Sequence, residues 1–266
     1  MNGLRVFVQG IGLLGPGLVS WENARAILRG EQAYVSVPTV LPPPARLPAA
    51  ERRRAGAAVK LALAVADEAV AQADVDPATL ATVFTSSSGE GANCHALCET
   101  LASPTPMVSP TRFTNSVHNA AAGCWHIAVA SRASSTSLCA FDGSFGAGLI
   151  EAASLVRASG APLLLVASDS PYPEPLHATR PLPDHFGTAL HLAPQRDART
   201  IAELTISLRA APCEFSTCDD PALDALRRGI PAARALPLLV TLAQARAPGQ
   251  LVIEALPRLH VQIDLA

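Results

Sequence analysis

Short apolar runs and longer periodic segments alternate along the first two thirds of the chain. Apolar residues three and four apart predict the clearest helix at residues 51–73, because this spacing places them on one helical face. Short apolar and β-branched runs predict strands at residues 4–10, 81–85, 136–141 and 163–167. Further helices are expected at residues 21–29, 92–101, 117–131 and 149–158, with a tight turn at 142–148. This alternation predicts an α/β fold with a largely parallel sheet covered by helices.

Proline-dense stretches interrupt the pattern. Residues 37–49 are predicted to form a surface loop, and a second proline-rich loop follows Asp169. Beyond it we expect strands at residues 188–192, 202–208 and 259–265, and helices at 223–228 and 233–246. We interpret residues 1–266 as a single domain, with an α/β half at about 1–195 and a tail of helices and strands at about 196–266.

Composition narrows the possible functions. The 266 residues are 49% hydrophobic and 16% charged, with a net charge of −2. Nucleic acid is not expected as the main partner, because phosphate binding needs clustered Lys and Arg. No apolar run reaches the roughly 18 residues of a membrane helix, and the N-terminus does not resemble a signal peptide. The six cysteines are too sparse for a disulfide scaffold, so we expect reduced thiols and a cytoplasmic location.

Two motifs suggest cofactor or metal sites, but neither has the context it needs. Residues 10–15 (GIGLLG) match the GxGxxG pattern of dinucleotide binding, yet Pro16 and Gly17 follow, and no second strand ends in an acidic residue near position 35. We expect a glycine turn that ends the first strand. Cys94, His95 and Cys98 lack a matching ligand pair, since Cys213 and Cys218 have unusual spacing. We therefore expect no cofactor and no metal.

A strand-to-helix elbow at residues 142–146 (DGSFG) is the strongest candidate for chemistry. It resembles the G-x-S-x-G elbow of serine hydrolases, which would make Ser144 the nucleophile, but Asp142 replaces the first glycine. Partners for such a triad are available downstream. They are His177, His185, His191 and Asp169.

Four stretches in order resemble the N-terminal half of β-ketoacyl synthases, the condensing enzymes of the thiolase fold. They are VFVQGIGLLGPG, TNSVHNAAAGCWHIAVAS, SLCAFDGSFGAGLIEAASLVRASGAPLLLVASD and HATRPLPDHFGTALHLAP, which together span about residues 1–195. The string SPTRFTNSVHNAAAG most resembles the short ketosynthase-like domains of aryl polyene and xanthomonadin pigment clusters. The resemblance implies a truncated thiolase-like fold.

The resemblance also implies how the elbow is used. Active ketosynthases carry a nucleophilic Cys at the elbow and two histidines on a C-terminal repeat. Alignment on residues 151–153 places Asp142 at the nucleophile position, with Cys139 three residues earlier inside the strand. No catalytic residue is therefore expected. The implied function is a non-catalytic partner of the chain-length-factor type. It would pair with an active ketosynthase as a heterodimer and meet acyl carrier protein through that complex, in polyene, polyketide or fatty-acid-like biosynthesis.

Two enzymatic alternatives remain at this point. One is an acyl-processing enzyme of the same fold that uses Cys139 or Asp142, and the other is the serine hydrolase based on Ser144. In the partner interpretation, residues 112–131 form the interface. Its candidate residues are Asn115, His118, Asn119 and Trp125. We also expect the tail at residues 220–266 to fold over the elbow helix.

Overall fold

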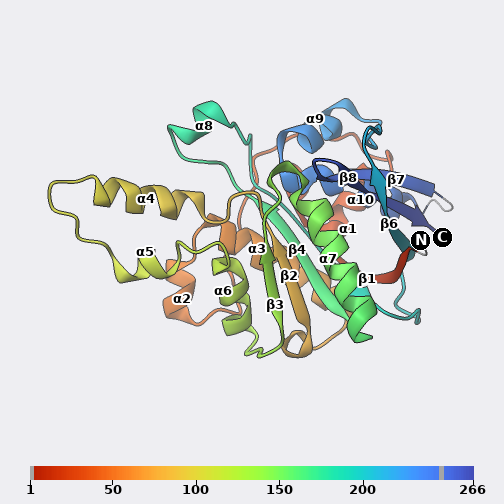
Figure 1. Cartoon of the computed structure of the whole chain (residues 1–266), viewed down its shortest axis with the longest axis horizontal. Coiled ribbons are helices and arrows are strands. Elements are labelled where there is room, and N and C mark those ends of the chain that lie inside the picture. The colour runs from red at the N-terminus through yellow and green to blue at the C-terminus, as the bar shows by residue number, and fades with distance from the viewer. Residues whose placement is uncertain (1–2, 246–248) are drawn as a thin grey trace.

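The computed structural model describes residues 3–245 and 249–266. Within them lies an eight-stranded sheet in the order β3-β2-β4-β5-β1-β6-β8-β7 (Figure 1). The strands are β1 (Leu4–Leu14), β2 (Ala81–Thr85), β3 (Ser135–Leu138), β4 (Leu163–Asp169), β5 (Phe186–Ala193), β6 (Ala202–Ala210), β7 (Gly249–Leu256) and β8 (Leu259–Leu265). The α-helices are α1 (Trp21–Leu28), α2 (Ala49–Arg54), α3 (Ala57–Ala73), α4 (Gly91–Leu101), α5 (Pro110–Thr114), α6 (Ala120–Ala128), α7 (Ser144–Ser159), α8 (Leu176–Thr179), α9 (Pro221–Gly229) and α10 (Leu236–Gln244).

The sheet is mixed. Strands β3, β2 and β4 run parallel, and every other described pairing is antiparallel. The α/β class is confirmed, but the expectation of a largely parallel sheet is wrong. A parallel return needs a crossover that spans the sheet. The proline-rich loop between β4 and β5 contains only the four-residue α8, so β5 returns antiparallel beside β4.

Helices cover both faces of the sheet. Alternate residues of β4 separate the two cores, with Leu163 and Leu165 in one and Leu164 and Val166 in the other. The first core includes residues of α1, α7 and α10, and the second includes residues of α3 and α6. Alternation follows from the two-residue repeat of a strand. The elbow helix α7 and the helix α3 therefore lie on opposite sides of the sheet.

Strand β1 continues through the glycine motif. Gly10 and Gly12 pair with β5 inside the strand, where a Cβ would clash with the carbonyl oxygens of Ala69 and Val65 on α3. The glycines let the helix backbone approach the strand closely. The expected glycine turn at this place is thus wrong, and the dinucleotide-binding alternative fails because no helix starts at Gly15.

Several predicted elements change at their ends. The helix expected at 51–73 breaks at residues 55–56 into α2 and α3, and the helix expected at 117–131 is reduced to α6. The Glu90 carboxylate lies against the start of α3, where a Cβ on Gly56 would clash with it, and the nearby backbone amides of Ala58 and Val59 favour its charged form. The helix expected at 233–246 becomes a 3₁₀ turn and α10, and residue 246 lies outside the described residues.

The tail extends the same sheet. Strands β6, β8 and β7 add to the edge beside β1, although β7 and the short helix α5 were not expected from the sequence. Helices α4 and α5 project from the body as an arm (Figure 1). In the described part of the chain, no helix combines the length and the apolar character needed to cross a membrane.

Candidate functional site at the strand-to-helix elbow

The elbow between β3 and α7 contains a strained residue. Phe141 has a φ of 52°, in the left-handed region that bulky residues rarely adopt, and its side chain is 61% exposed. A single 3₁₀ turn, Phe141–Gly143, then leads into α7. In nucleophile elbows, strain of this kind presents the reactive side chain at the tip. Here a phenylalanine ring occupies the tip, one residue before Asp142.

The Ser144 hydroxyl stabilises the turn. It accepts a hydrogen bond from the Ala140 amide at 3.0 Å and donates one to the Phe141 carbonyl at 2.7 Å. The residue is 1% exposed. A serine nucleophile needs an exposed hydroxyl and a base within hydrogen-bond reach. Among the described residues, the hydrogen-bonded histidines contact Ser86, Thr82 and Ser170 rather than Ser144. The serine-hydrolase alternative is therefore wrong.

Cys139 lies two residues before the elbow tip. Its side chain is exposed, and its thiol donates a weak hydrogen bond to the Ser87 carbonyl at 3.4 Å. Catalytic cysteines are activated by a cation, a histidine or a helix N-terminus. Cys139 follows the end of β3, outside the strand in which the sequence placed it, and precedes the 3₁₀ turn, so it does not lie at the N-terminus of α7.

Asp142 is held by arginines. Its carboxylate accepts a hydrogen bond from Arg180 at 2.7 Å, and Arg234 lies 4.0 Å away. The guanidinium of Arg180 also stacks 3.5 Å above the centre of the Phe141 ring. Arg234 continues the network to Glu254 at 3.2 Å. The two arginines and two carboxylates balance in charge, and Arg180 lies over one face of the exposed Phe141 ring.

Phe141, Arg180 and Arg234 are not among the site residues expected from the sequence. Arg180 stands in the stretch HATRPLP, so its place in a resembling segment was a usable signal. Arg234 offered none, because its role depends on the tail folding against α7.

A buried carboxylate supports the turn beside the elbow. Asp169, at the end of β4, accepts hydrogen bonds from the Ser87 amide and hydroxyl, both at 2.7 Å, and from the Ala232 amide at 2.8 Å. Burial raises the pKa of Asp169, and these donors lower it in part. The side chain links the end of β2 to the tail. Its role is positional, since it is 1% exposed.

The tail covers the elbow helix, as expected from the sequence. A Cβ on Gly143 or Gly146 would clash with the backbone of β7 at Ala255 or Glu254. The two glycines therefore allow the strand to cross directly over the first turn of α7. The chain itself fills the space beside the elbow on this side.

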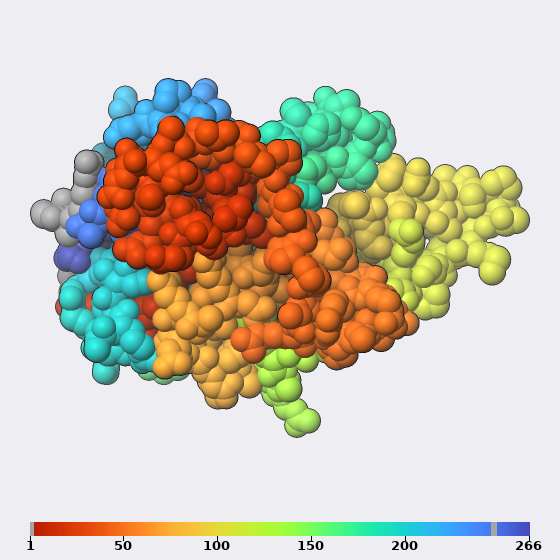
Figure 2. Space-filling model, turned by 180° about the vertical axis from the view of Figure 1, so that it is seen from behind, coloured from red at the N-terminus to blue at the C-terminus, as the bar shows by residue number. Residues whose placement is uncertain are grey.

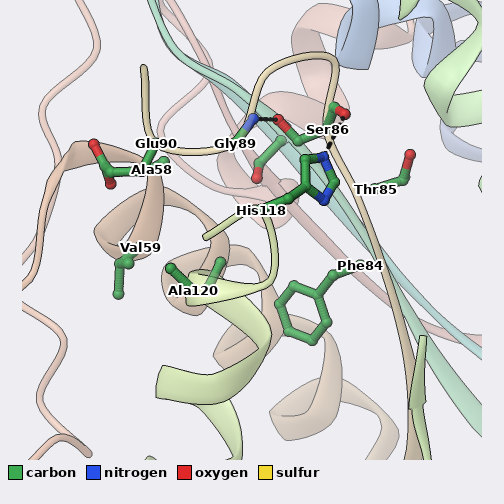
Figure 3. A pocket seen from close by; sticks show the side chains of 11 residues that line it. Ala58, Val59, Phe84, Thr85, Ser86, Gly89, Glu90, His118 and Ala120 are labelled. Carbon is green, nitrogen blue, oxygen red and sulfur yellow. Dashed lines mark hydrogen bonds between the residues drawn. The ribbon is translucent and has the colours of Figure 1, made fainter. Parts of the chain in front are cut away.

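A small cavity lies at the ends of β2 and β4. It is lined by Ser86, Glu90, Ser168 and the first turn of α6, and its volume of about 20 Å³ has room for about one water molecule (Figure 3). His118 borders it and donates a hydrogen bond to the Ser86 carbonyl at 3.2 Å. Burial raises the pKa of Glu90, although the two α3 amides and Lys60 lower it in part. The cavity is too small for an acyl chain.

The predicted interface residues separate into two groups. His118 and Asn119 are exposed before α6, and Asn115 is half-buried at the end of α5. Trp125 is 0% exposed and packs into the core shared with α3. The interface prediction is wrong for Trp125, because its apolar ring lies on the inner face of α6.

The residues that suggested a metal site lie along the surface of α4. Cys94 and Cys98 are exposed on α4, and His95 pairs with Glu99 at 3.3 Å. Across the described residues, no three His, Cys, Asp or Glu side chains are grouped to hold a metal ion.

Solved structures share this fold. The chain is similar to a ketosynthase (ApeO) in complex with its chain length factor (ApeC) from Xenorhabdus doucetiae, at 21% identity and TM-score 0.73, covering 98% of this chain and 99% of that one. It is also similar to the ishigamide ketosynthase/chain length factor, at 16% identity and TM-score 0.71, covering 98% and 99%. A third structure, AntDE:AntF, a type II PKS acyl-carrier protein in complex with its ketosynthase, matches at 12% identity and TM-score 0.74, covering 100% and 99%.

The match to a family extends beyond the fold. The chain matches none of the curated proteins. The model of the β-ketoacyl synthase N-terminal domain matches residues 21–224, which is more than half of the chain and includes the elbow, α6 and the arm. The resemblance noted in the sequence is thus confirmed, and the chain belongs to the family of β-ketoacyl synthase N-terminal domains.

Proposed function

We propose that this chain is a non-catalytic, cytoplasmic subunit of the chain-length-factor type, which pairs with an active ketosynthase. The observation that carries the proposal is the elbow tip. Phe141 occupies the strained position, and Arg180 stacks on its ring at 3.5 Å. Because Phe141 occupies the strained position, we assign the nucleophile position to Phe141 rather than to Asp142. A phenyl ring cannot form an acyl thioester, so an elbow of this kind cannot carry the substrate.

The partner would bind at the arm, α6 and β3. Large apolar side chains are exposed along the arm, with Leu101 at 61%, Met107 at 86% and Phe113 at 68%. Helix α4 buries only Leu97 and α5 buries no residue, so the arm has little core of its own. Strand β3 ends the sheet and leaves one row of backbone groups unpaired. Apolar patches and open edges of this kind mark protein interfaces.

The similar structures support the choice of partner and substrate. Two of them are described as a ketosynthase with a chain length factor, and a third contains an acyl-carrier protein. By analogy, the complex would extend a carrier-bound acyl chain, and this subunit would help to shape the acyl cavity. The resemblance in the sequence favours a polyene product, and the third match, a type II PKS complex, favours a polyketide.

A condensation assay tests the proposal. The purified chain, incubated with acyl- and malonyl-carrier proteins, should give no ketoacyl product. The complex obtained by affinity purification of the tagged chain from its native cells should give product. Turnover by the chain alone would overturn the proposal, as would recovery of the chain without any ketosynthase.

Substitutions at the elbow sharpen the test. Neither Phe141→Cys nor Asp142→Cys, each in a Cys139→Ser background, should restore condensation by the isolated chain, because a thiol without proton-handling histidines cannot complete the reaction. Iodoacetamide provides the labelling readout. Fast, saturable labelling of Cys139 in the unmodified chain, with loss of an activity, would favour the acyl-processing alternative instead.

A further inference from the structure

A groove lies on the α3 side of the sheet, opposite the elbow helix. Its volume is about 490 Å³, within the range of small-molecule sites. One wall is the end of β1 and the following turn, a second is the proline-rich loop at residues 40–45, and the floor is α3. Figure 2 shows this side of the molecule, with the red N-terminal segment and the orange loop and helix.

The groove is mostly apolar. Leu14 and the backbone of Leu13 form its inner end, and three consecutive prolines, 42–44, form its roof. Val19 and Val40 at the rim are 65% and 80% exposed. Prolines hold the roof in one conformation, so the groove is formed before any ligand binds. An apolar tail placed here would cover the exposed valines.

The charged groups of the floor differ in whether they have partners. Glu68 accepts hydrogen bonds from the backbone amides of Leu13 at 2.9 Å and Trp21 at 2.6 Å, and Asp67 pairs with Arg46. Lys60, the only lysine of the chain, forms no ion pair within 4.0 Å in the part of the chain that the structure describes. The ammonium acts on Glu90 at longer range and lowers the pKa of that carboxyl, but no ion pair holds it among the described residues, so it can bind a ligand carboxylate.

Asp67 and Glu68 are half-buried, and this burial raises the pKa values of both carboxyls. A charge pair in such surroundings is screened less than one at the surface. Lys60 and Glu68 are eight residues apart on α3, or about 12 Å along the helix axis. The distance from Lys60 to the end of the groove beside Glu68 matches the length of a medium-chain acyl tail.

We propose that this groove binds a medium-chain monocarboxylate, with its carboxylate on Lys60 and its tail between the proline roof and Leu14. The site is separate from the elbow and from α6. It would bind its ligand whether or not the chain pairs with a ketosynthase.

Binding of decanoate to the full chain, measured by isothermal titration calorimetry, tests the proposal. We expect saturable binding with a stoichiometry of one. Lys60→Met keeps the aliphatic stem and removes the charge, and it should weaken binding about tenfold or more. Arg157 is an exposed cation with a long side chain on α7, so Arg157→Met is the matched control. This variant should bind decanoate as the unmodified chain does. Decanol and decyltrimethylammonium should bind no better than decanoate binds to Lys60→Met.

The single lysine gives a second readout. After reductive ¹³C-methylation, Lys60 contributes one dimethylamine signal besides the N-terminal amine, and decanoate should shift the Lys60 signal alone. Val40→Asp, on the exposed rim, should weaken binding without lowering the melting temperature. Absence of saturable decanoate binding would overturn the proposal. Equal affinity of Lys60→Met and the unmodified chain, or an unmoved Lys60 signal at saturation, would also overturn it.

Discussion

At the scale of single residues, nothing within the described chain explains why position 123 is a glycine. It lies in the middle of α6 on the exposed side, and a Cβ there would meet nothing within 4 Å. A glycine inside a helix costs roughly 0.5–1 kcal/mol relative to alanine. Next to it is an open polar hollow lined by His118, His126 and two serines of β3. Close approach of a partner's backbone would account for the missing side chain.

Gly123→Ala should therefore have opposite effects on folding and on pairing. The isolated chain should gain about 0.5–1 kcal/mol in free energy of unfolding, measured by urea denaturation. Pairing with the ketosynthase should weaken in gel filtration, and Gly123→Leu should weaken it further. Ala71→Leu, on the exposed side of α3, is the control for added bulk. Undiminished pairing by Gly123→Leu would remove α6 from the interface.

His191 makes stability depend on pH. The residue is 1% exposed on β5, and both ring nitrogens lack a hydrogen-bond partner among the described residues. Burial, with help from Arg199, lowers the pKa of His191 to about 4, against an opposing effect of Asp197. The unfolded chain, with an ordinary pKa of about 6.5, therefore binds the proton more readily than the folded chain does.

The contribution of His191 to stability is intact above pH 6.5 and falls as the pH drops toward 4, by about 3 kcal/mol at the acid end. His191→Leu should remove this part of the acid sensitivity in urea denaturation at several pH values. It should cost little at pH 7, because no hydrogen bond is lost. His177→Leu, on α8, should leave the pH dependence unchanged. If His191→Leu lost as much free energy of unfolding at acid pH as the unmodified chain, another group would be responsible.

At the scale of elements, the contact between β7 and α7 closes the elbow. Gly146→Ala would push a methyl group into the Glu254 carbonyl, and such overpacking typically costs 1–3 kcal/mol. We expect a lower free energy of unfolding, in contrast to the gain expected for Gly123→Ala. If Gly146→Ala left the free energy of unfolding unchanged, β7 would not cover the elbow in solution.

At the scale of the whole molecule, the two ends of the sheet differ. The tail extends one end with β6, β8 and β7, whereas β3, α6 and the arm form the other end with exposed apolar side chains. Expressed alone, the chain should self-associate through this second end. Co-expression with its ketosynthase should give a heterodimer in light scattering and a higher yield. A stable monomer with a cooperative melt would contradict the need for a partner.

Much of this organisation was readable from local patterns. The strand at residues 81–85 and the helix ending at residue 73 were predicted at the positions where they occur, because apolar periodicity and the Asp76-Pro77 break are local signals. The elbow was predicted for the same reason, as a glycine-rich turn between a strand and an apolar helix. The ordered motifs also identified the family.

Tertiary structure decided the rest. The sequence predicted a turn at Gly10 and Gly12. In the structure these glycines are part of β1, where the backbone of α3 approaches them closely. The sequence predicted Trp125 as an interface residue. Only the packing of α6 against α3 shows that its ring lies in the core. The strain at Phe141 depends on how β3 and α7 are held, so alignment on residues 151–153 pointed to Asp142 instead. The sequence by itself determined the class, the family and the elbow, because these follow from nearest neighbours along the chain. Strand direction, the inner side of α6 and the cover over the elbow depend on contacts between distant segments, which no local pattern records.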